Sequence, residues 1–428
     1  MNTLAVAAAK VLRANDLGAM TAAAPSLYPH QWSWDAAFIT IGLARIDVAR
    51  AVTELRTLLG AQWSTGMLPH IRFAPGGDYF PGADRWDSSV AAAAPRDVRT
   101  SGICQPPVHA LAVCAILDAD RAVGEAFAAE TFDAWLAWHR WLATARDADG
   151  DGLVEIHHGW ESGMDNSPRW DSVYAGVVPG ADLPAFERRD TLVADATERP
   201  TDTDYARYLW LVEQLKRVRY DDAAAAEVVD FRAADVFLSA CLAPASDVLG
   251  GIGDELGRTA DAAEMRALAV RCREGVAATV DPVTGLARDR DLRTGDWIGT
   301  ETVAGFAPLV AGGPRDLLDA QVGLLLGDRW CGYPGLRVPV PPSTSPASNA
   351  FRARTYWRGP QWPFLTWLFG FALRRHGYDD AAGQLREGCL EQLSDGRFGE
   401  YYDPFTGTAV GSPDQSWTAA VTLDWLAP

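Results

Sequence analysis

Lysine and clustered basic residues are nearly absent from the 428-residue sequence. Lys10 and Lys216 are the only lysines, and the arginines do not gather into a basic segment. Acidic residues outnumber basic ones by 56 to 38, which gives a formal net charge of −18. Because phosphate groups are bound by clustered positive charge, this composition argues against nucleic acid and against anionic membranes as partners.

Long apolar runs are also missing. The longest candidate for a membrane span, Trp362–Leu373, has twelve residues and stops at Arg374 and Arg375, whereas about twenty are needed. The first eighteen residues lack the basic start of an export signal, and charged residues interrupt their apolar positions at helical spacing. We therefore expect a cytoplasmic protein without a membrane-spanning segment.

Metal and nucleotide motifs are absent. The six cysteines are scattered without CxxC pairs or zinc-like spacing, so we expect reduced cysteines that pack in the interior. The segment "DADGDGLVEIHH" begins like a calcium loop, but its twelfth position is His158 instead of a glutamate, and a turn is the better prediction. The segment "LGGIGDEL" does not match the dinucleotide pattern, and no Walker A motif occurs. No metal and no cofactor are predicted.

What the sequence does contain is one amphipathic helix after another. Apolar residues recur at helical spacing, as in Val48, Val52, Leu55 and Leu59. Strand signals are few and short, so the predicted class is all-α. The predicted helices cover approximately 3–15, 35–44, 47–62, 107–123, 125–146, 204–218, 233–252, 258–279, 300–311, 315–326, 361–376, 379–393 and 413–426.

The connections between these helices alternate in length. Tight turns are predicted at 45–46, 124, 253–257, 312–314 and 377–378. Long links are predicted at 16–34, 63–106, 147–203, 327–360 and 394–412. Such alternation is expected from a ring of about six antiparallel helix hairpins with all the long loops at one end. We predict a single (α/α)6-barrel domain over 1–428, with 63–106 and 147–203 as insertions that cap its open end.

Many tryptophans lie in or beside the long links. They are Trp32, Trp34, Trp63, Trp86, Trp160, Trp170, Trp330, Trp357 and Trp362. Loops lie at the surface and exposed indoles are unfavourable, so these rings either line a cavity at the barrel end or fill a satellite core under the loops. The two interpretations are compatible.

Acidic residues collect in the same long links. They are Asp35, Glu161, Asp165, Asp171, Glu400 and Asp403. Aromatic rings stack on sugar rings and carboxylates bind hydroxyl groups, so the combination is typical of a sugar site. Two carboxyl groups facing each other across such a cavity can also break a glycosidic bond.

Asp165 and Glu400 are the predicted catalytic pair. Asp165 follows Gly163 and Met164 at a tight turn, where partial desolvation would raise its pKa and keep it protonated as an acid. Glu400 precedes two tyrosines whose hydroxyl groups could position a water molecule. An inverting reaction would hold the two carboxyl groups about 6.5–9.5 Å apart, and a retaining one about 5–5.5 Å apart.

The chain resembles glycoside hydrolase family 63, in particular its glucosylglycerate and mannosylglycerate hydrolase group. The motifs that carry the resemblance occur in the family's order over nearly the full length. They are "NDLGAMT", "LYPHQWSWDAAF", "GMLPHI", "YFPG", "TSGICQPPVHA", "GWESGMDNSPRWDS", "RYLWL", "PSTSP", "YWRGPQWP", "EYYDPFTG" and "QSW". The resemblance implies an (α/α)6 barrel, hydrolysis with inversion and no metal in catalysis.

The resemblance also implies site residues. It makes Asp165 of "GMDN" the general acid and Glu400 of "EYY" the general base, in agreement with the choice from the residues alone. The residues implied to surround the sugar are Trp34, Asp35, Gln105, Trp160, Trp357 and Trp362. Those implied to hold glycerate or the neighbouring sugar edge are Tyr28, Tyr79, Arg199, Tyr205, Tyr356 and Gln415. A guanidinium such as that of Arg199 can bind a carboxylate through two parallel hydrogen bonds.

The predicted activity is hydrolysis of 2-O-α-D-glucosyl-D-glycerate to glucose and glycerate. The alternatives are a mannosylglycerate hydrolase and an α-glucosidase for neutral substrates, because glucose and mannose differ only in the direction of one hydroxyl group. Outside this class, the alternatives are a sugar-binding barrel without activity and a terpene cyclase, but the sequence has no DxDD or DDxxD motif for a cyclase. The predicted ligand is a small sugar, and a homo-oligomer is compatible with the sequence.

Overall fold

The computed structural model of the protein describes residues 3–77 and 79–427. Its α-helices are α1 (Thr3–Ala14), α2 (Ser33–Ala44), α3 (Val48–Leu59), α4 (Ala83–Trp86), α5 (His109–Ala119), α6 (Arg121–Ala145), α7 (Asp171–Ala175), α8 (Asp202–Arg217), α9 (Asp222–Val228), α10 (Val236–Glu255), α11 (Thr259–Ala278), α12 (Ala307–Ala311), α13 (Arg315–Leu326), α14 (Pro363–Arg375), α15 (Asp379–Gln392) and α16 (Ser416–Trp425). Its 3-10 helices are η1 (Ser88–Val90), η2 (Gly159–Ser162), η3 (Pro168–Trp170), η4 (Asp190–Leu192), η5 (Ala196–Glu198), η6 (Val303–Phe306) and η7 (Tyr356–Arg358). Its strands are β1 (Gln31–Trp32), β2 (Ile71–Arg72), β3 (Val154–Ile156), β4 (Ala233–Asp235), β5 (Asp289–Asp291), β6 (Trp297–Ile298), β7 (Tyr401–Tyr402) and β8 (Ala409–Val410).

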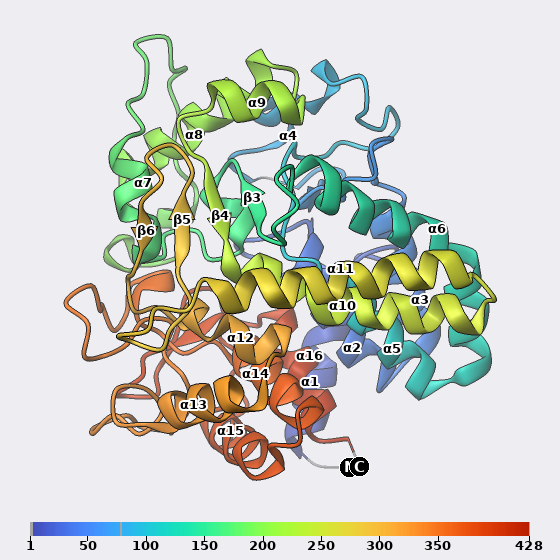
Figure 1. Ribbon diagram of the computed structural model, residues 1–428, viewed down its shortest axis with the longest axis vertical. Helices are drawn as coiled ribbons and strands as arrows, with labels where there is room; N and C mark the ends of the chain where they lie inside the picture. Colours follow the sequence, from blue (N-terminus) through green and yellow to red (C-terminus); the bar gives the residue numbers. More distant parts are fainter. Residues whose placement is uncertain (1–2, 78, 428) are drawn as a thin grey trace.

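Twelve of the described α-helices form two concentric rings. In the described part of the chain, the inner ring follows the order α2, α5, α10, α12, α14 and α16, and α16 packs against α2 to close it. Each inner helix also packs against one outer helix. The outer partners, in the same order, are α3, α6, α11, α13, α15 and α1. The pairing of α10 with α11 is clear in Figure 1. The predicted (α/α)6 barrel is confirmed.

Burial explains which helix is inner and which is outer. All twelve residues of α2 are buried, because it has neighbours on every side. The outer helix α3 instead buries one stripe that includes Val52, Leu55 and Leu58 and leaves the opposite face to solvent. The side chain of Asp47 caps α3 by accepting a hydrogen bond from the amide of Arg50 (3.0 Å).

The inner helix α10 is long and apolar enough to cross a membrane, by length and composition alone. It is the one described helix that meets this test, and 83% of its most apolar window is buried inside the protein. Helices α5, α6, α11 and α12 pack around it. Like α2, α10 is rich in apolar residues because it has neighbours on every side.

A small antiparallel sheet with strand order β3-β4-β5-β6 was not predicted. The helix predicted from residue 233 is wrong at its start, because Ala233–Asp235 forms β4 and pairs with both β3 and β5. The side chain of Asp235 then accepts hydrogen bonds from the amides of Phe237 and Leu238, which fixes the first turn of α10. Alanine favours helices by local propensity, so the sequence extended the predicted helix over Ala233 and Ala234.

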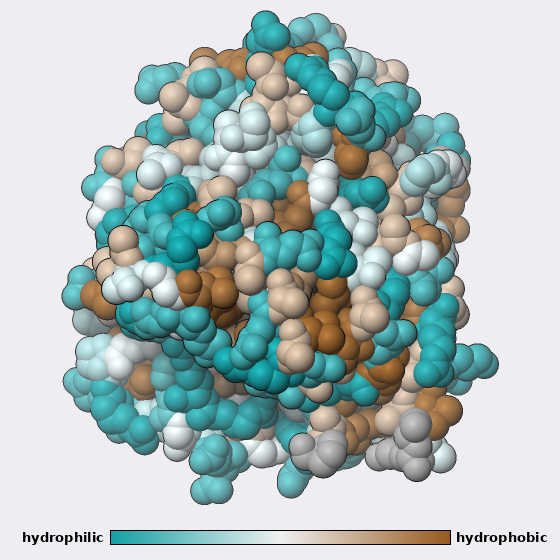
Figure 2. All heavy atoms as spheres, turned by 90° about the vertical axis from the view of Figure 1, so that its right-hand side faces the viewer, coloured by the Kyte–Doolittle hydropathy of each residue, from teal (hydrophilic) through white to brown (hydrophobic). Residues whose placement is uncertain are grey.

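The short turns and the long links lie at different places on the molecule. Figure 2 shows the side that carries the α10–α11 turn, where hydrophilic residues are mixed with smaller apolar areas. The segments that leave the barrel between the hairpins include α4, α7, α8 and α9, which lie together in the upper part of Figure 1. That 63–106 and 147–203 form a cap stays a prediction, and both segments contribute to the pocket described below.

The closure of the inner ring depends on a glycine. A Cβ atom added at Gly42 of α2 would lie 2.3 Å from the Cα of Ala420 in α16. We therefore expect Gly42→Ala to lower the free energy of unfolding by about 1–3 kcal/mol, since an overpacked helix contact must move backbone. Gly323→Ala is the matched control, because Gly323 is also helical and a Cβ there meets nothing within 4 Å. The control should raise stability by about 0.5–1 kcal/mol, and equal effects in urea unfolding would contradict this account.

Candidate active site

One pocket opens among the loops that follow the outer helices. It is lined by Tyr28, Trp32, Trp34, Asp35, His70, Ile71, Tyr79, Pro81, Gln105, Trp160, Gly163, Asp165, Arg199, Tyr205, Tyr356, Glu400, Gln415 and Trp417. Twelve of the fourteen residues predicted from the sequence are in this set. Residues far apart in the chain thus meet at one place, as a sugar site requires.

Trp357 and Trp362 are the two predicted residues outside the lining. Their rings stack on each other with centroids 3.8 Å apart, and Trp362 also contacts the rings of Tyr356 and Tyr401. They pack against the lining residue Tyr356 without lining the pocket themselves. Most of the other loop tryptophans are likewise buried away from the pocket, namely Trp63, Trp86, Trp170 and Trp330. The tryptophans therefore serve both purposes, a lined cavity and a packed layer around it.

Six lining residues were not among the predicted site residues. They are Trp32, His70, Ile71, Pro81, Gly163 and Trp417. All six fall within the quoted sequence motifs, so the motifs located them even though no chemical role singled them out. Gln105, which was predicted, accepts a hydrogen bond from the amide of Trp34 (3.3 Å) and so orders the start of α2.

Asp165 is presented by a tight turn after η2. Gly163 has a φ of +69°, and a Cβ there would lie 2.6 Å from the ring of Trp34. Both the backbone conformation and the lack of space therefore require glycine at this position. The hydroxyl of Ser162 accepts hydrogen bonds from the amide of Met164 (3.0 Å) and from the indole of Trp170 (3.2 Å). The turn is therefore fixed from both sides of the acid.

The environment of Asp165 favours its protonated form. Burial raises the pKa of Asp165 to about 7, with a further contribution from the charge of Glu400. The guanidinium of Arg199 and the hydroxyl of Tyr356 act in the opposite direction. The rings of Tyr79, Tyr174, Tyr205 and Tyr208 also lie within electrostatic range of this carboxyl group. A carboxyl group with this pKa can donate a proton near neutral pH.

Glu400 is held in a defined orientation. Its Oε1 accepts a hydrogen bond from the hydroxyl of Tyr28 (2.9 Å), and its Oε2 accepts one from the amide of Ser412 (2.9 Å). Burial raises the pKa of Glu400, but Arg199 and these hydrogen bonds oppose the rise. Donors to both oxygens favour the ionised form, and each oxygen keeps a lone pair for a further partner.

Arg199 is the buried cation of the pocket. Its Nη2 donates to the hydroxyl of Tyr28 (3.0 Å), and its Nη1 lies 3.9 Å from Oε1 of Glu400. Its Nε donates to Asp190 (3.2 Å), which is also paired with Arg188. The Nη1 atom has no hydrogen-bond partner among the described residues. An unsatisfied guanidinium nitrogen at a pocket wall is suited to bind an anionic group of a ligand.

Asp35 is the third carboxyl group of the pocket. Burial raises its pKa well above the ordinary value, and the charges of Glu400 and Asp165 add to the effect. Gln415 and Trp417 line the same pocket, and Oε1 of Gln415 and Nε1 of Trp417 are buried without a hydrogen-bond partner among the described residues. Carboxyl, amide and indole groups are the kinds of group that bind the hydroxyl groups of a sugar.

The other acids of the long links have arginine partners outside the pocket. Asp171 forms a two-bond pair with Arg358 (2.8 and 2.6 Å), and Asp403 pairs with Arg354 (3.2 Å). Glu161 is the most deeply held of them and pairs with Arg146. Its two contacts with that guanidinium are 2.9 and 3.0 Å long.

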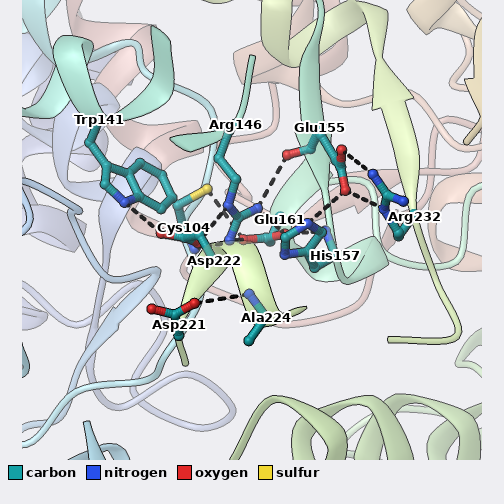
Figure 3. A network of polar contacts seen from close by, with 10 residues as sticks. All are labelled: Cys104, Trp141, Arg146, Glu155, His157, Glu161, Asp221, Asp222, Ala224 and Arg232. Atoms are coloured by element: carbon teal, nitrogen blue, oxygen red, sulfur yellow. Dashed lines mark hydrogen bonds and ion pairs between the residues drawn. The ribbon is translucent and has the colours of Figure 1, made fainter. Parts of the chain in front are cut away.

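Glu161 anchors the loop that carries Trp160. In Figure 3 the guanidinium of Arg146 lies between Glu161 and Asp222, and the amides of Cys104 and His157 also donate to Glu161. Burial opposes ionisation, yet Arg146 and the other donors lower the pKa of Glu161 to about 2. The neighbouring Glu155 joins His157 (2.7 Å) to Arg232 in the same network. Glu161 is therefore a structural anion beside the site.

Within the described residues, no group of three or more His, Cys, Asp or Glu side chains is arranged to hold a metal ion. The calcium-like segment forms a turn in which Asp147 accepts hydrogen bonds from the amide of Gly152 (3.3 Å) and from Arg271 (3.1 Å). The cysteines at 104, 241, 272, 331 and 389 are buried, and none of the six forms a disulfide.

Comparisons with known proteins agree with this geometry. Residues 28–418 match the model of the mannosylglycerate hydrolase MGH1-like glycoside hydrolase domain. The chain is 54% identical to glucosylglycerate hydrolase of Mycolicibacterium hassiacum, over 99% of this chain and 97% of that protein. It is 39% identical to mannosylglycerate hydrolase MGH1 of Selaginella moellendorffii, over 97% of this chain and 84% of that protein.

A solved structure is similar over the whole chain. It is the GH63 mannosylglycerate hydrolase from Thermus thermophilus in complex with Tris and D-glycerate, with 38% identity and a TM-score of 0.90. The match covers 99% of this chain and all of that one.

Proposed function

Because the chain belongs to the mannosylglycerate hydrolase MGH1-like glycoside hydrolase family, we propose that it hydrolyses 2-O-α-D-glucosyl-D-glycerate to glucose and glycerate. It is a glycoside hydrolase, and the choice of substrate is supported by 54% identity to glucosylglycerate hydrolase of Mycolicibacterium hassiacum. Mannosylglycerate is the second candidate, supported by the relatives from Selaginella moellendorffii and Thermus thermophilus at 39% and 38% identity.

The proposal rests on one observation. The carboxyl groups of Asp165 and Glu400, which differ in how their surroundings affect their charge, lie in the same pocket as the buried guanidinium of Arg199. Asp165 is poised to hold a proton, while Glu400 accepts hydrogen bonds that favour its charge. Environments that separate the pKa values of two carboxyl groups are how glycosidases assign an acid and a base.

In the proposed reaction Asp165 donates its proton to the glycosidic oxygen as the bond to the anomeric carbon breaks. Glu400 takes a proton from a water molecule, which attacks the anomeric carbon from the opposite face. The product is glucose with inverted configuration, together with glycerate. Tyr28 and the amide of Ser412 keep the acceptor oxygens of Glu400 directed toward that water.

Arg199 is proposed to bind the carboxylate of glycerate. The protein has a net charge of −18, so an organic anion needs a local cation to offset the repulsion. Arg199 is 6% exposed, and its Nη1 has no hydrogen-bond partner in the described chain. Tyr79 and Tyr205 line the same pocket.

The proposal is tested by a substrate panel followed by NMR. The panel contains α-glucosylglycerate, α-mannosylglycerate, trehalose and neutral α-glucobioses, and each is scored for liberated monosaccharide. We expect glucosylglycerate to give the highest kcat/KM and β-glucose to appear first in the NMR spectrum. Release of α-glucose first would contradict inversion, and a preference for a neutral disaccharide would contradict the anionic substrate.

Arg199→Ala separates the two kinds of substrate. This variant should lose activity toward glucosylglycerate selectively, because a neutral glucoside has no carboxylate to bind. Equal losses on both substrates would mean that Arg199 acts on Glu400 and Asp165 alone. A cytoplasmic location and a homo-oligomer stay predictions from the sequence.

A further inference from the structure

Asn166, the residue after Asp165, joins two loops that come from distant parts of the chain. Its side-chain Oδ1 accepts a hydrogen bond from the amide of Trp357 (3.0 Å), and its backbone carbonyl accepts one from Nη1 of Arg358 (3.3 Å). Asn166 is buried and does not line the pocket. The loop of the general acid is thus tied directly to η7.

Tyr356 precedes Trp357 and has an unusual backbone conformation. Its φ is +33°, in the left-handed region that a bulky side chain seldom adopts. The Arg199 guanidinium lies 4.1 Å from the centroid of the Tyr356 ring, and the Tyr356 hydroxyl lies 3.4 Å from the Tyr28 hydroxyl. The same hydroxyl lowers the pKa of both Asp165 and Glu400. Such a conformation persists only where the surroundings fix it, and it is common at functional sites.

We infer that Asn166 is a positioning residue. Its side-chain oxygen holds the Trp357 peptide, so that the Tyr356 hydroxyl stays beside the Tyr28 hydroxyl that donates to Glu400, in the pocket that Asp165 also lines. The peptide that Asn166 binds is the one that joins Tyr356 to Trp357. A change in that peptide rotates the backbone of Tyr356, and the distance from its Cα to its hydroxyl amplifies the movement. This role rests on the proposed function, since it assigns Asn166 to the orientation of that same pair.

Other contacts hold the η7 loop in place without Asn166. Trp357 stacks on Trp362, and Arg358 pairs with Asp171 through two bonds. Removal of the Asn166 side chain therefore leaves the loop anchored and frees mainly one peptide. We expect Asn166→Ala to fold, with a defect in catalysis larger than its loss of stability would suggest.

A double-mutant cycle with Tyr356→Phe tests the inference. Asn166→Ala and Tyr356→Phe should each lower kcat on the order of 10-fold, with a smaller change in KM, and the double variant should resemble Tyr356→Phe alone. Asn166→Asp keeps an oxygen that can accept the Trp357 hydrogen bond, so it should recover most of the loss. Losses that multiply in the double variant, or an Asn166→Ala enzyme with normal kcat, would overturn the inference.

The pH profile separates positioning from a general loss of stability. Without the Tyr356 hydroxyl in place, the pKa values of both carboxyl groups rise, so both limbs of kcat/KM should move to higher pH. Gln62→Ala is the matched control, because the Gln62 amide donates to the carbonyls of Gly66 and Ala134 (2.8 Å each), away from the pocket. It should lower the melting temperature without moving either limb.

These outcomes are distinct from a failure of the proposed function. If the wild-type enzyme releases no glucose from glucosylglycerate, the proposed function fails. The cycle can then be run with the best substrate of the panel. If the wild type is active and the cycle is additive, the assignment of Asn166 alone is overturned.

Discussion

Replacement of Asp165 by asparagine should lower kcat by at least about 10²-fold, the scale on which general acid catalysis is lost. Asparagine has nearly the same shape but no proton to give to the leaving oxygen. Steady-state kinetics on glucosylglycerate measure the loss. The loss should be much smaller on α-glucosyl fluoride, because fluoride leaves without protonation.

The pH dependence gives an independent check on the same residue. Asp165 must be protonated to act, and burial raises its pKa to about 7. The wild-type kcat/KM should therefore be high below that pH and fall as the pH rises through it. Asp165→Asn should remove this basic limb. Normal activity of the variant, or a basic limb that survives in it, would take Asp165 out of the mechanism.

Glu400→Gln should produce a loss of similar size, at least about 10²-fold in kcat, on both glucosylglycerate and α-glucosyl fluoride. The water must be deprotonated whatever the leaving group, so glucosyl fluoride should give no recovery here. This contrast between the two variants assigns the acid and the base. Loss of the acidic limb should accompany the change, because the wild-type base works only when ionised.

Glu400→Ala supplies a control for the position of the base. The shorter side chain leaves room for azide, an anion that needs no deprotonation. Azide attack from the Glu400 side on the α-glucoside should give β-glucosyl azide and restore turnover. Formation of the α-azide would instead place the attacking group on the other face of the sugar.

The barrel was predictable because its signal is repeated along the chain. Each inner helix follows a long link, and each outer helix except α1 follows a short turn, so many weak periodicities support the same architecture. The strands were missed because they have two or three residues each. Ala233 and Ala234 favour a helix locally, and only their partners in β3 and β5 make this segment a strand.

The site was predictable to the extent that side-chain chemistry is local. The turn around Gly163 and the carboxyl group of Asp165 can be found in a short stretch of sequence. What lies behind the pocket cannot, and Trp357 and Trp362 show this, since aromatic residues in a loop can either face a cavity or stack on each other. The pairing of Glu161 with Arg146 was equally hidden, because it depends on packing. In the sequence Glu161 looks like an ordinary loop charge and Arg146 like an ordinary charge at the end of a helix.

The order of the inner ring also affects how the pocket arises during synthesis. Tyr28 and Glu400 are 372 positions apart in the chain, yet they share a hydrogen bond, and α16 must reach α2 before the circle is complete. The chain must therefore leave the ribosome to beyond Glu400 before the acid, the base and Arg199 can come together. Earlier hairpins can form as they emerge. Until α16 packs against α2 they form an incomplete ring whose end helices expose apolar surface, and chaperones bind such surface.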